Sequence, residues 1–266
     1  MSPSLTAPSD FALALADIAS EAGAAAMRHF STDCAKGAKE DGSPVSRADE
    51  DAEAVIIARL KALEPNLPII AEESSAEGSP PDPGPRFALV DPVDGTKDFL
   101  ACRPEFTVNI AVVQDATPVV GCVYAPAMKR LYLGEVGQGA FQAEWAPGEP
   151  APMGPWRPIH VRPADPKRLV ALVSRSDVNA ETEAYLQALG VAERRGIASS
   201  LKFCLLAEGA GDCYPRFQRV MEWDIAAGHA LLVAAGGRVT TVDGGPIRYG
   251  RVQEGYRAPM FIAQGA

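Results

Sequence analysis

The sequence predicts a layered α/β fold. Long segments carry apolar residues at helical spacing, short β-rich runs lie between them, and strands alternate with helices through the second half of the chain. Of the 266 residues, 47% are hydrophobic and 22% are charged, which is typical of a globular protein with a sizeable core. A segment rich in Pro and Gly at 146–158 predicts two subdomains, an N-terminal α+β part (1–150) and a C-terminal α/β part (151–266).

Two helices come first in the predicted order. Residues 10–30 and 47–63 both place apolar side chains on one stripe of a helix. The segment between them (31–44) has little apolar content and contains Lys36 and Lys39. It is either a solvated connector or a lid that brings one of these lysines to a substrate.

The strongest motif lies at 87–99. Its first four residues are apolar and predict a buried strand, and Pro92 should end that strand at Asp91 because proline cannot donate to a sheet. Asp91 and Asp94 then converge across a turn. Two carboxylates this close repel each other, so the natural occupant between them is a hard divalent cation with oxygen ligands. The plainer alternative is an Asp-rich surface turn.

The same turn suits a phosphate. Gly95 allows the backbone to come close to a ligand, and Thr96 offers an N–H group and a hydroxyl. A metal beside a phosphate indicates metal-assisted phosphoryl hydrolysis. Aspartyl-phosphate phosphatases carry one residue between their two motif aspartates and this chain carries two, so neither carboxylate is assigned as a nucleophile.

Other strands and helices surround this motif. A short strand at 67–71 delivers the acidic pair Glu72 and Glu73, and two β-rich runs at 106–113 and 119–124 form a hairpin. Further strands are predicted at 131–133, 140–142, 169–173, 195–198, 212–214 and 238–242, and further helices at 180–189, 200–208 and 224–235.

Two more acids stand near predicted helix starts. Asp49 falls in the first turn of the second helix, where the helix dipole alone favours an acid, so a capping role is expected. Asp224 begins an almost wholly apolar helix. It is either an N-cap or a carboxylate from the second half of the chain that closes on the metals held by the first.

Charge and composition limit the partners. The net charge of −9 argues against a nucleic-acid polymer, because that binding relies on clustered cations. The five scattered cysteines indicate reduced thiols in a cytoplasmic protein, with no signal peptide and no transmembrane segment expected. Peripheral attachment to the inner membrane is compatible with the sequence, as is a monomer or a homodimer.

Three acidic motifs together resemble the inositol monophosphatase superfamily of lithium-sensitive, Mg²⁺-dependent phosphatases. They are the Glu-Glu pair at 72–73, the Asp-Pro-Val-Asp-Gly-Thr segment at 91–96 and the Trp-Asp pair at 223–224. The resemblance covers nearly the whole chain. It implies an αβαβα five-layer sandwich of the inositol monophosphatase and fructose-1,6-bisphosphatase type, with the C-terminal subdomain closing the active site.

The resemblance also implies a site with two or three Mg²⁺ ions, in which Asp91 bridges the first and the second. The implied metal ligands are Glu72, Asp91, the backbone carbonyl of Val93, Asp94 and Asp224. The implied catalytic residues are Asp49, Thr96 and Glu72, with Asp49 and Thr96 orienting the attacking water. This role replaces the capping role of Asp49. Gly95 and Thr96 would hold the scissile phosphate.

Two further segments resemble the 3'(2'),5'-bisphosphate nucleotidase branch of this superfamily. They are Thr-Lys-Asp-Phe at 96–99 and Ser-Ser-Leu-Lys-Phe-Cys at 199–204. Ser199 and Lys202 are one helical turn apart and can face one cleft, and Arg216 adds a cation where inositol phosphatases carry a glutamate. A second phosphate favours Lys and Arg, whereas a neutral polyol favours acceptors. The alternative is that Lys202 and Arg216 are ordinary surface charges.

The implied reaction removes the 3'-phosphate of adenosine 3',5'-bisphosphate and gives AMP and phosphate. A second candidate substrate is 3'-phosphoadenylyl sulfate. The nearest alternative activity is a phosphatase for inositol-1-phosphate or another sugar phosphate. An alternative of another class is a non-catalytic sensor of nucleotide or metal on the same fold.

Overall fold

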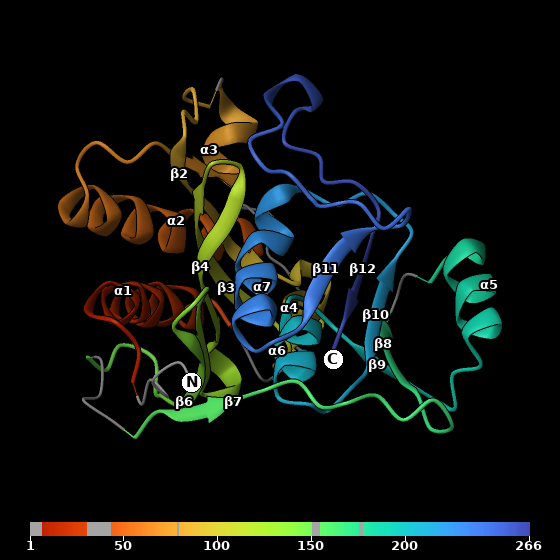
Figure 1. The fold of residues 1–266 in the computed structure, drawn as a ribbon. Helices are drawn as coiled ribbons and strands as arrows, with labels where there is room; N and C mark the ends of the chain where they lie inside the picture. The colour runs from red at the N-terminus through yellow and green to blue at the C-terminus, as the bar shows by residue number, and fades with distance from the viewer. Residues whose placement is uncertain (1–6, 31–43, 79, 151–154, 176–177) are drawn as a thin grey trace.

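The structure is a computed structural model that describes residues 7–30, 44–78, 80–150, 155–175 and 178–266. In this part of the chain two sheets alternate with three layers of helices, as Figure 1 shows. The prediction of a layered α/β fold with an αβαβα arrangement is therefore confirmed. Lys36 and Lys39 lie outside the described residues.

The larger sheet has seven strands and is antiparallel except for its first pair. Its order is β1 (Ile69–Ala71), β2 (Arg86–Asp94), β3 (Thr107–Gln114), β4 (Thr117–Ala125), β5 (Arg130–Glu135), β6 (Gly139–Glu144) and β7 (Arg157–Ile159). The second sheet is mixed and has five strands. Its order is β11 (Arg238–Thr241), β12 (Phe261–Gln264), β10 (Cys213–Arg216), β8 (Val170–Ser174) and β9 (Glu193–Ile197).

The helices form the other three layers. Helices α1 (Asp10–Met27) and α2 (Pro44–Leu63) cover one face of the larger sheet, α6 (Leu201–Ala207) and α7 (Glu222–Ala234) lie between the sheets, and α5 (Ala180–Leu189) packs outside the second sheet. Shorter segments are α3 (Glu72–Glu77), α4 (Thr96–Leu100) and the 3₁₀ turns η1 (Pro126–Met128) and η2 (Val252–Glu254). None of the helices in the described ranges combines the length and the apolar character needed to cross a bilayer.

The larger sheet is buried on both faces. Along β2, Ala88 and Val90 join the core formed with α1 and α2, whereas Phe87 and Leu89 join the core formed with α6 and α7. Because both faces of the strand meet apolar partners, its sequence is continuously apolar instead of alternating. This burial holds the carboxyl end of β2, and the acids on it, in the middle of the molecule.

Close packing brings α7 onto the sheet that carries these acids. At Gly121 of β4, a Cβ atom would lie 2.1 Å from the carbonyl oxygen of Ala227, so only glycine lets the helix approach this far. The helix contacts β2, β3, β4 and β5. It thereby places the C-terminal half of the chain directly against the Asp91 strand.

The strand at the central motif runs further than predicted. Pro92 lies inside β2, which continues to Asp94, so the prediction that the strand ends at Asp91 is wrong. On one side β1 pairs with β2 only as far as Val90, so no neighbour there needs the N–H that proline lacks. On the other side the pairing with β3 shifts register between Asp91 and Asp94, which is bulge-like.

Two helices begin earlier than predicted, and this changes the interpretation of two acids. Because α2 starts at Pro44, Asp49 lies beyond its first turn, and the capping role first expected for it is wrong. Because Met221 is the N-cap of α7, Asp224 is the third residue of that helix and not its N-cap. Its side chain still accepts the Met221 N–H at 2.8 Å, as in a capping box.

Some elements and one bond were not foreseen. Helix α3 and strands β7 and β12 were not predicted from the sequence, and since β7 pairs with β6, the larger sheet continues to Ile159. The division into subdomains near 150 remains a prediction. Of the cysteines described, Cys122, Cys204 and Cys213 are free and buried, whereas Cys102 is disulfide-bonded. The expectation of fully reduced thiols is therefore wrong for Cys102, because scattered spacing does not reveal pairing in space.

Candidate active site

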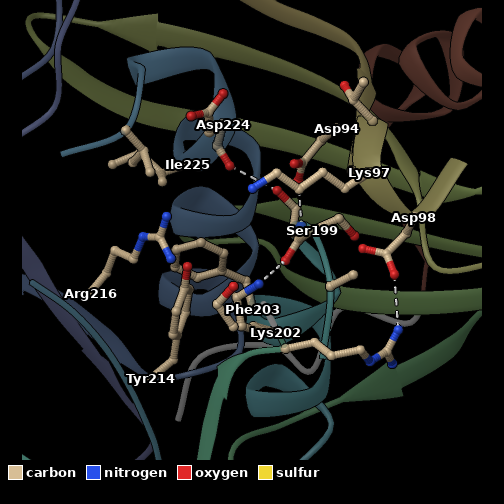
Figure 2. Close-up of a pocket in the computed structure, with 17 residues that line it drawn as sticks. Asp94, Lys97, Asp98, Ser199, Lys202, Phe203, Tyr214, Arg216, Asp224 and Ile225 are labelled. Carbon is tan, nitrogen blue, oxygen red and sulfur yellow. Dashed lines mark hydrogen bonds and ion pairs between the residues drawn. The ribbon is translucent and has the colours of Figure 1, made fainter. Parts of the chain in front are cut away.

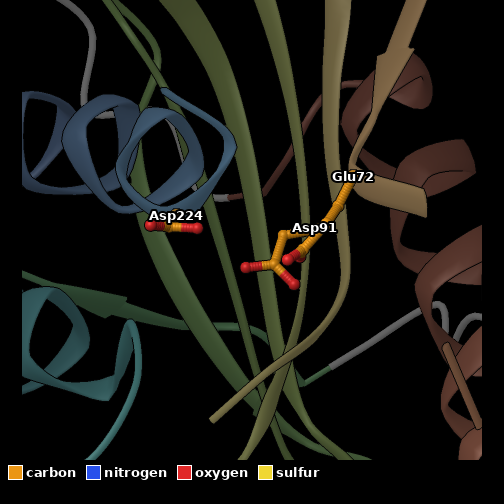
Figure 3. A group of neighbouring side chains, drawn as sticks. All are labelled: Glu72, Asp91 and Asp224. Carbon is orange, nitrogen blue, oxygen red and sulfur yellow. The ribbon is translucent and has the colours of Figure 1, made fainter. Parts of the chain in front are cut away.

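Three carboxylates from distant parts of the chain meet at one point. Glu72 starts α3, Asp91 lies near the end of β2 and Asp224 is in the first turn of α7. One oxygen from each lies within 4.8 Å of the others, and Figure 3 shows the three side chains converging. Asp91 is buried, so a surface turn is the wrong description of this motif.

Burial and mutual repulsion make this cluster electrostatically unfavourable when it is fully ionised. The pKa of Asp91 lies well above its usual value, first because the carboxyl is buried and then because Asp94, Glu72 and Asp224 surround it. The pKa of Asp224 is raised well above its usual value by burial and by Asp94, and that of Glu72 is raised to about 7 by burial and by Glu73. A cation among these groups would remove the repulsion and keep them ionised.

The residues present fit a hard divalent cation. The Oδ1 atom of Asp91 is buried and has no hydrogen-bond partner among the described residues, which is the state expected of an oxygen reserved for a ligand. All three converging groups are carboxylates, the donors that Mg²⁺ prefers, and no described His or Cys belongs to the cluster. The carbonyl of Val93 and the carboxylate of Asp94 follow Asp91 on the same strand, and their roles as ligands remain a prediction.

Asp94 is held by the second half of the chain. Its Oδ2 atom accepts the backbone N–H of Ser200 at 2.6 Å, and Thr107 and Asn109 approach the same oxygen at 3.5 Å. The hydroxyl of Ser200 donates to the carbonyl of Asp224 at 2.8 Å. Ser200 therefore links the acid at the end of β2 to the start of α7.

Helix α2 contributes two buried acids beside the cluster. Asp49 is 6% exposed, and its pKa is raised to about 8, first by burial and then by the charges of Glu73 and Glu72. Glu53, one turn later, accepts the backbone N–H groups of Glu73 at 2.8 Å and Ser74 at 2.9 Å, together with the Ser74 hydroxyl. It fixes the start of α3, which carries Glu72.

Glu53 was not among the site residues predicted from the sequence. A signal existed, because Glu53 lies four residues after Asp49 and therefore on the same helical face. Its neighbours Ala52 and Ile56 belong to the buried stripe of the helix. An acid that borders a buried stripe needs a partner, and this requirement points to a structural or functional contact.

A cavity of about 240 Å³ opens beside the carboxylates. Its lining comes from the end of β2, from α4 with the glycine before it and from the second half of the chain. It includes Asp94, Gly95, Thr96, Lys97, Ser199, Lys202, Tyr214, Arg216 and Asp224 (Figure 2). The structure therefore brings together the residues predicted to bind substrate. It adds Lys97, an exposed cation that extends across the pocket in Figure 2 and for which the sequence predicted no role.

Gly95 adopts a backbone conformation that other residues avoid. Its φ angle is 101°, and a Cβ atom there would lie 3.1 Å from the carbonyl oxygen of Glu105 and 3.4 Å from the Cβ of Ser199. Glycine therefore allows the turn after Asp94 to pass close to the opposite wall of the pocket. Thr96, the first residue of α4, is exposed on the pocket side.

The two cations predicted to bind a second phosphate differ in their surroundings. Lys202 is only 4% exposed, and burial lowers the pKa of its ammonium to about 8, so it is not an ordinary surface charge. Arg216 is half-buried at the end of β10 and lines the same pocket.

Arg175 joins the two halves of the chain at this pocket, and it was also missed. It follows β8 and donates to Asp98 of α4 at 3.0 Å and to Glu105. Asp98 is 6% exposed and also accepts from Arg103 at 2.5 Å. Through these ion pairs, Arg175 and Asp98, which both line the pocket, hold α4 to the second half of the chain.

Comparisons with known proteins agree with this arrangement. The model of the inositol monophosphatase family matches residues 8–262. The 3'(2'),5'-bisphosphate nucleotidase CysQ of Salmonella typhimurium is 42% identical over 223 residues, 84% of this chain and 86% of that protein. The CysQ nucleotidase of Buchnera aphidicola is 38% identical over 211 residues, 79% of this chain and 76% of that protein. The crystal structure of CysQ from Bacteroides thetaiotaomicron, a bacterial member of the same family, aligns with a TM-score of 0.81 and 34% identity, covering 96% of this chain and 97% of that one.

Proposed function

Because the chain belongs to the inositol monophosphatase family, we propose that it is a Mg²⁺-dependent phosphatase that removes the 3'-phosphate of adenosine 3',5'-bisphosphate. The products are AMP and phosphate, and 3'-phosphoadenylyl sulfate is a second candidate substrate. The observation that carries the proposal is the meeting of Glu72, Asp91 and Asp224 beside a pocket lined by cations. The name of the CysQ relatives supports the choice of a nucleotide bisphosphate.

Glu72, Asp91, the Val93 carbonyl, Asp94 and Asp224 would hold two or three Mg²⁺ ions. When bound, these ions supply positive charge that offsets the phosphate and lower the pKa of water at the site. The protein's own part is to gather the oxygen donors before the metal arrives. The unpartnered Oδ1 of Asp91 and the repulsion among the carboxylates both support this role.

Asp49 and Thr96 would orient the attacking water, and Gly95 would let the phosphate approach the backbone. Burial and then the charges of Glu73 and Glu72 raise the pKa of Asp49 to about 8, so a cation bound by the neighbouring acids would favour the ionised carboxylate that can accept a proton. Water adds to phosphorus and the bond to the 3'-oxygen breaks. The proton that Asp49 takes from the water is returned through solvent to the departing oxygen, which leaves as the 3'-hydroxyl of AMP. No nucleophilic side chain is required, because positioning and charge neutralisation supply most of the acceleration.

The second phosphate of the substrate would meet the cationic side of the pocket. Arg216 can bind a phosphate with two parallel N–H donors, and Lys97 adds a flexible charge from α4. Ser199 offers a hydroxyl on the same wall, whereas the buried ammonium of Lys202 donates to backbone carbonyls of the protein. A neutral polyol would gain less from these cations, and Asp98, a carboxylate that lines the pocket, already accepts from Arg175.

The test is phosphate release by the purified protein, with and without Mg²⁺. Adenosine 3',5'-bisphosphate should be turned over faster than inositol-1-phosphate at equal concentration, and only with Mg²⁺. Faster turnover of inositol-1-phosphate would assign the protein to the sugar phosphatases of the family. No release from either compound with Mg²⁺ present would favour the non-catalytic sensor.

A variant tests the second-phosphate site. Arg216→Gln should lower the preference for adenosine 3',5'-bisphosphate over 3'-AMP, which lacks the second phosphate, by about tenfold or more, since a hydrogen bond to a charged group contributes roughly 1.5–3 kcal/mol. Arg219→Gln is the matched control, because Arg219 is exposed and paired with Glu254. An unchanged preference in Arg216→Gln would refute this part of the proposal.

A further inference from the structure

The ammonium of Lys202 is used inside the protein. Lys202 lies in α6, and its Nζ donates to the carbonyl oxygens of Ile197 at 3.2 Å and Ser199 at 2.7 Å. The same Nζ lies 5.0 Å from the centre of the Tyr214 ring, which is a cation–π contact. Lys202 is only 4% exposed, so its N–H groups have almost no access to solvent. The two carbonyls and the Tyr214 ring are the partners that these N–H groups find inside the protein.

The segment that Lys202 holds has an unfavourable backbone conformation. Ser199 has a φ angle of 52°, in the left-handed region that residues with a Cβ rarely adopt. A non-glycine residue stays there only when its surroundings enforce it. The bond from Lys202 to the carbonyl of Ser199 ties this residue directly, and the bond to Ile197 ties the chain just before it.

This turn determines where Asp94 and Asp224 are held. The residue after Ser199 is Ser200, whose N–H donates to Asp94 at 2.6 Å and whose hydroxyl donates to the carbonyl of Asp224 at 2.8 Å. If Ser199 relaxed to a right-handed conformation, the direction of the Ser200 N–H would change. Asp94 would then lose its shortest described hydrogen bond, and the start of α7 would lose its link to the turn.

We propose that Lys202 is a positioning residue, which fixes the left-handed turn at Ser199 and through it the Asp94 and Asp224 carboxylates. This inference rests on the proposed function for the role of those carboxylates as Mg²⁺ ligands. It assigns Lys202 a different part from Arg216: Lys202 organises the metal-binding acids, whereas Arg216 meets the substrate.

The test is Mg²⁺ binding by titration calorimetry in the absence of any nucleotide. Lys202→Met keeps the length of the side chain and removes its donors, and it should weaken Mg²⁺ binding about tenfold, the effect of releasing roughly one strained residue. The preference for adenosine 3',5'-bisphosphate over 3'-AMP should stay within about threefold of the wild type, on the order of 0.6 kcal/mol. Lys167→Met, at an exposed position before β8, is the control and should bind Mg²⁺ as the wild type does.

A second substitution separates positioning from a general loss of stability. Glycine adopts positive φ without strain, so Ser199→Gly added to Lys202→Met should restore most of the Mg²⁺ affinity. If Lys202→Met does not fold, the Mg²⁺ affinity is compared with and without Ser199→Gly in Lys202→Gln, which keeps one donor group. Failure of the glycine to rescue the affinity would contradict the proposal.

One outcome would replace the proposal with a direct role in substrate binding. It is unchanged Mg²⁺ binding in Lys202→Met together with a selective rise in KM for the bisphosphate over 3'-AMP. The calorimetry needs no turnover, so it stands even if the wild-type protein hydrolyses neither adenosine 3',5'-bisphosphate nor 3'-AMP. Failure of the proposed activity and failure of the Lys202 inference are therefore distinguishable.

Discussion

Replacing Glu53 by Gln should weaken the support of the metal-binding acids from α2. The Glu53 carboxylate is 4% exposed and accepts the N–H groups of Glu73 and Ser74 at 2.8 and 2.9 Å, one on each oxygen, together with the Ser74 hydroxyl. Gln has nearly the same shape, but one of its two oxygens becomes an NH₂ donor. At least one backbone N–H at the start of α3 would then face another donor.

The size of the effect follows from these contacts. A hydrogen bond to a charged acceptor contributes about 1.5–3 kcal/mol to stability. A negative charge at a helix start adds roughly 0.3–1 kcal/mol. Glu53→Gln should therefore destabilise the protein by about 2–4 kcal/mol, or about 4–16 °C in melting temperature at 2–4 °C per kcal/mol. Because Glu72 begins the same helix, Mg²⁺ affinity should fall as well.

Thermal unfolding followed by circular dichroism, with and without Mg²⁺, measures both effects. Glu50→Gln is the matched control, since Glu50 is an exposed acid on the same helix and the substitution removes the same charge. The control should melt within a degree or two of the wild type, since isolated surface charges contribute at most ~0.5 kcal/mol. A melting temperature of Glu53→Gln equal to that of Glu50→Gln would refute the argument that these hydrogen bonds stabilise α3.

Two further predictions concern the phosphate turn and the core. Gly95→Ala places a methyl group 3.1 Å from the Glu105 carbonyl oxygen, at a φ of 101° that alanine adopts only with strain. The protein should still fold, but the rate of phosphate release should fall about tenfold or more. An unchanged kcat would contradict the role of this turn. Burial lowers the pKa of His229, which bonds to the Tyr249 hydroxyl at 2.8 Å, to about 4, so the folded state favours the neutral ring. The neutral His229 ring contributes fully to the stability of the folded state above the pKa of about 6.5 that it has in the unfolded chain. As the pH falls from there toward about 4, the unfolded chain binds the proton first, and the free energy of unfolding drops by about 3 kcal/mol in all. Urea unfolding at several pH values should show a shallower loss in His229→Leu than in the wild type, and equal pH dependence would count against this assignment.

The local sequence predicted the main elements of the fold well. The apolar run before Asp91 marked a buried strand, and the β-rich runs after it marked the hairpin of β3 and β4, which turns at Asp115 and Ala116 with φ angles of 50° and 60°. Both signals depend only on neighbouring residues, so the sequence contains them directly. The exact end of β2 was missed, because whether Pro92 fits a strand depends on which strands lie beside it.

The contacts that organise the site were harder to predict, because they join residues far apart in the chain. Glu53 bonds to a residue 20 positions away, Arg175 to Asp98 over 77 positions and Ser200 to Asp94 over 106 positions. No periodicity or spacing rule reports such pairs. The acids of the central cluster were identified by resemblance and by the repulsion that they imply, and the buried groups that hold them became visible only in the folded structure.

The most direct test of the central claim is titration calorimetry of Mg²⁺ into the wild-type protein and the Asp91→Asn variant. Asp91 contributes an unpartnered buried oxygen to the meeting point of Glu72 and Asp224, so its loss should weaken Mg²⁺ binding by about tenfold or more. Circular dichroism should show an unchanged fold. Equal Mg²⁺ affinity in the two proteins would contradict the account that these carboxylates form a metal centre.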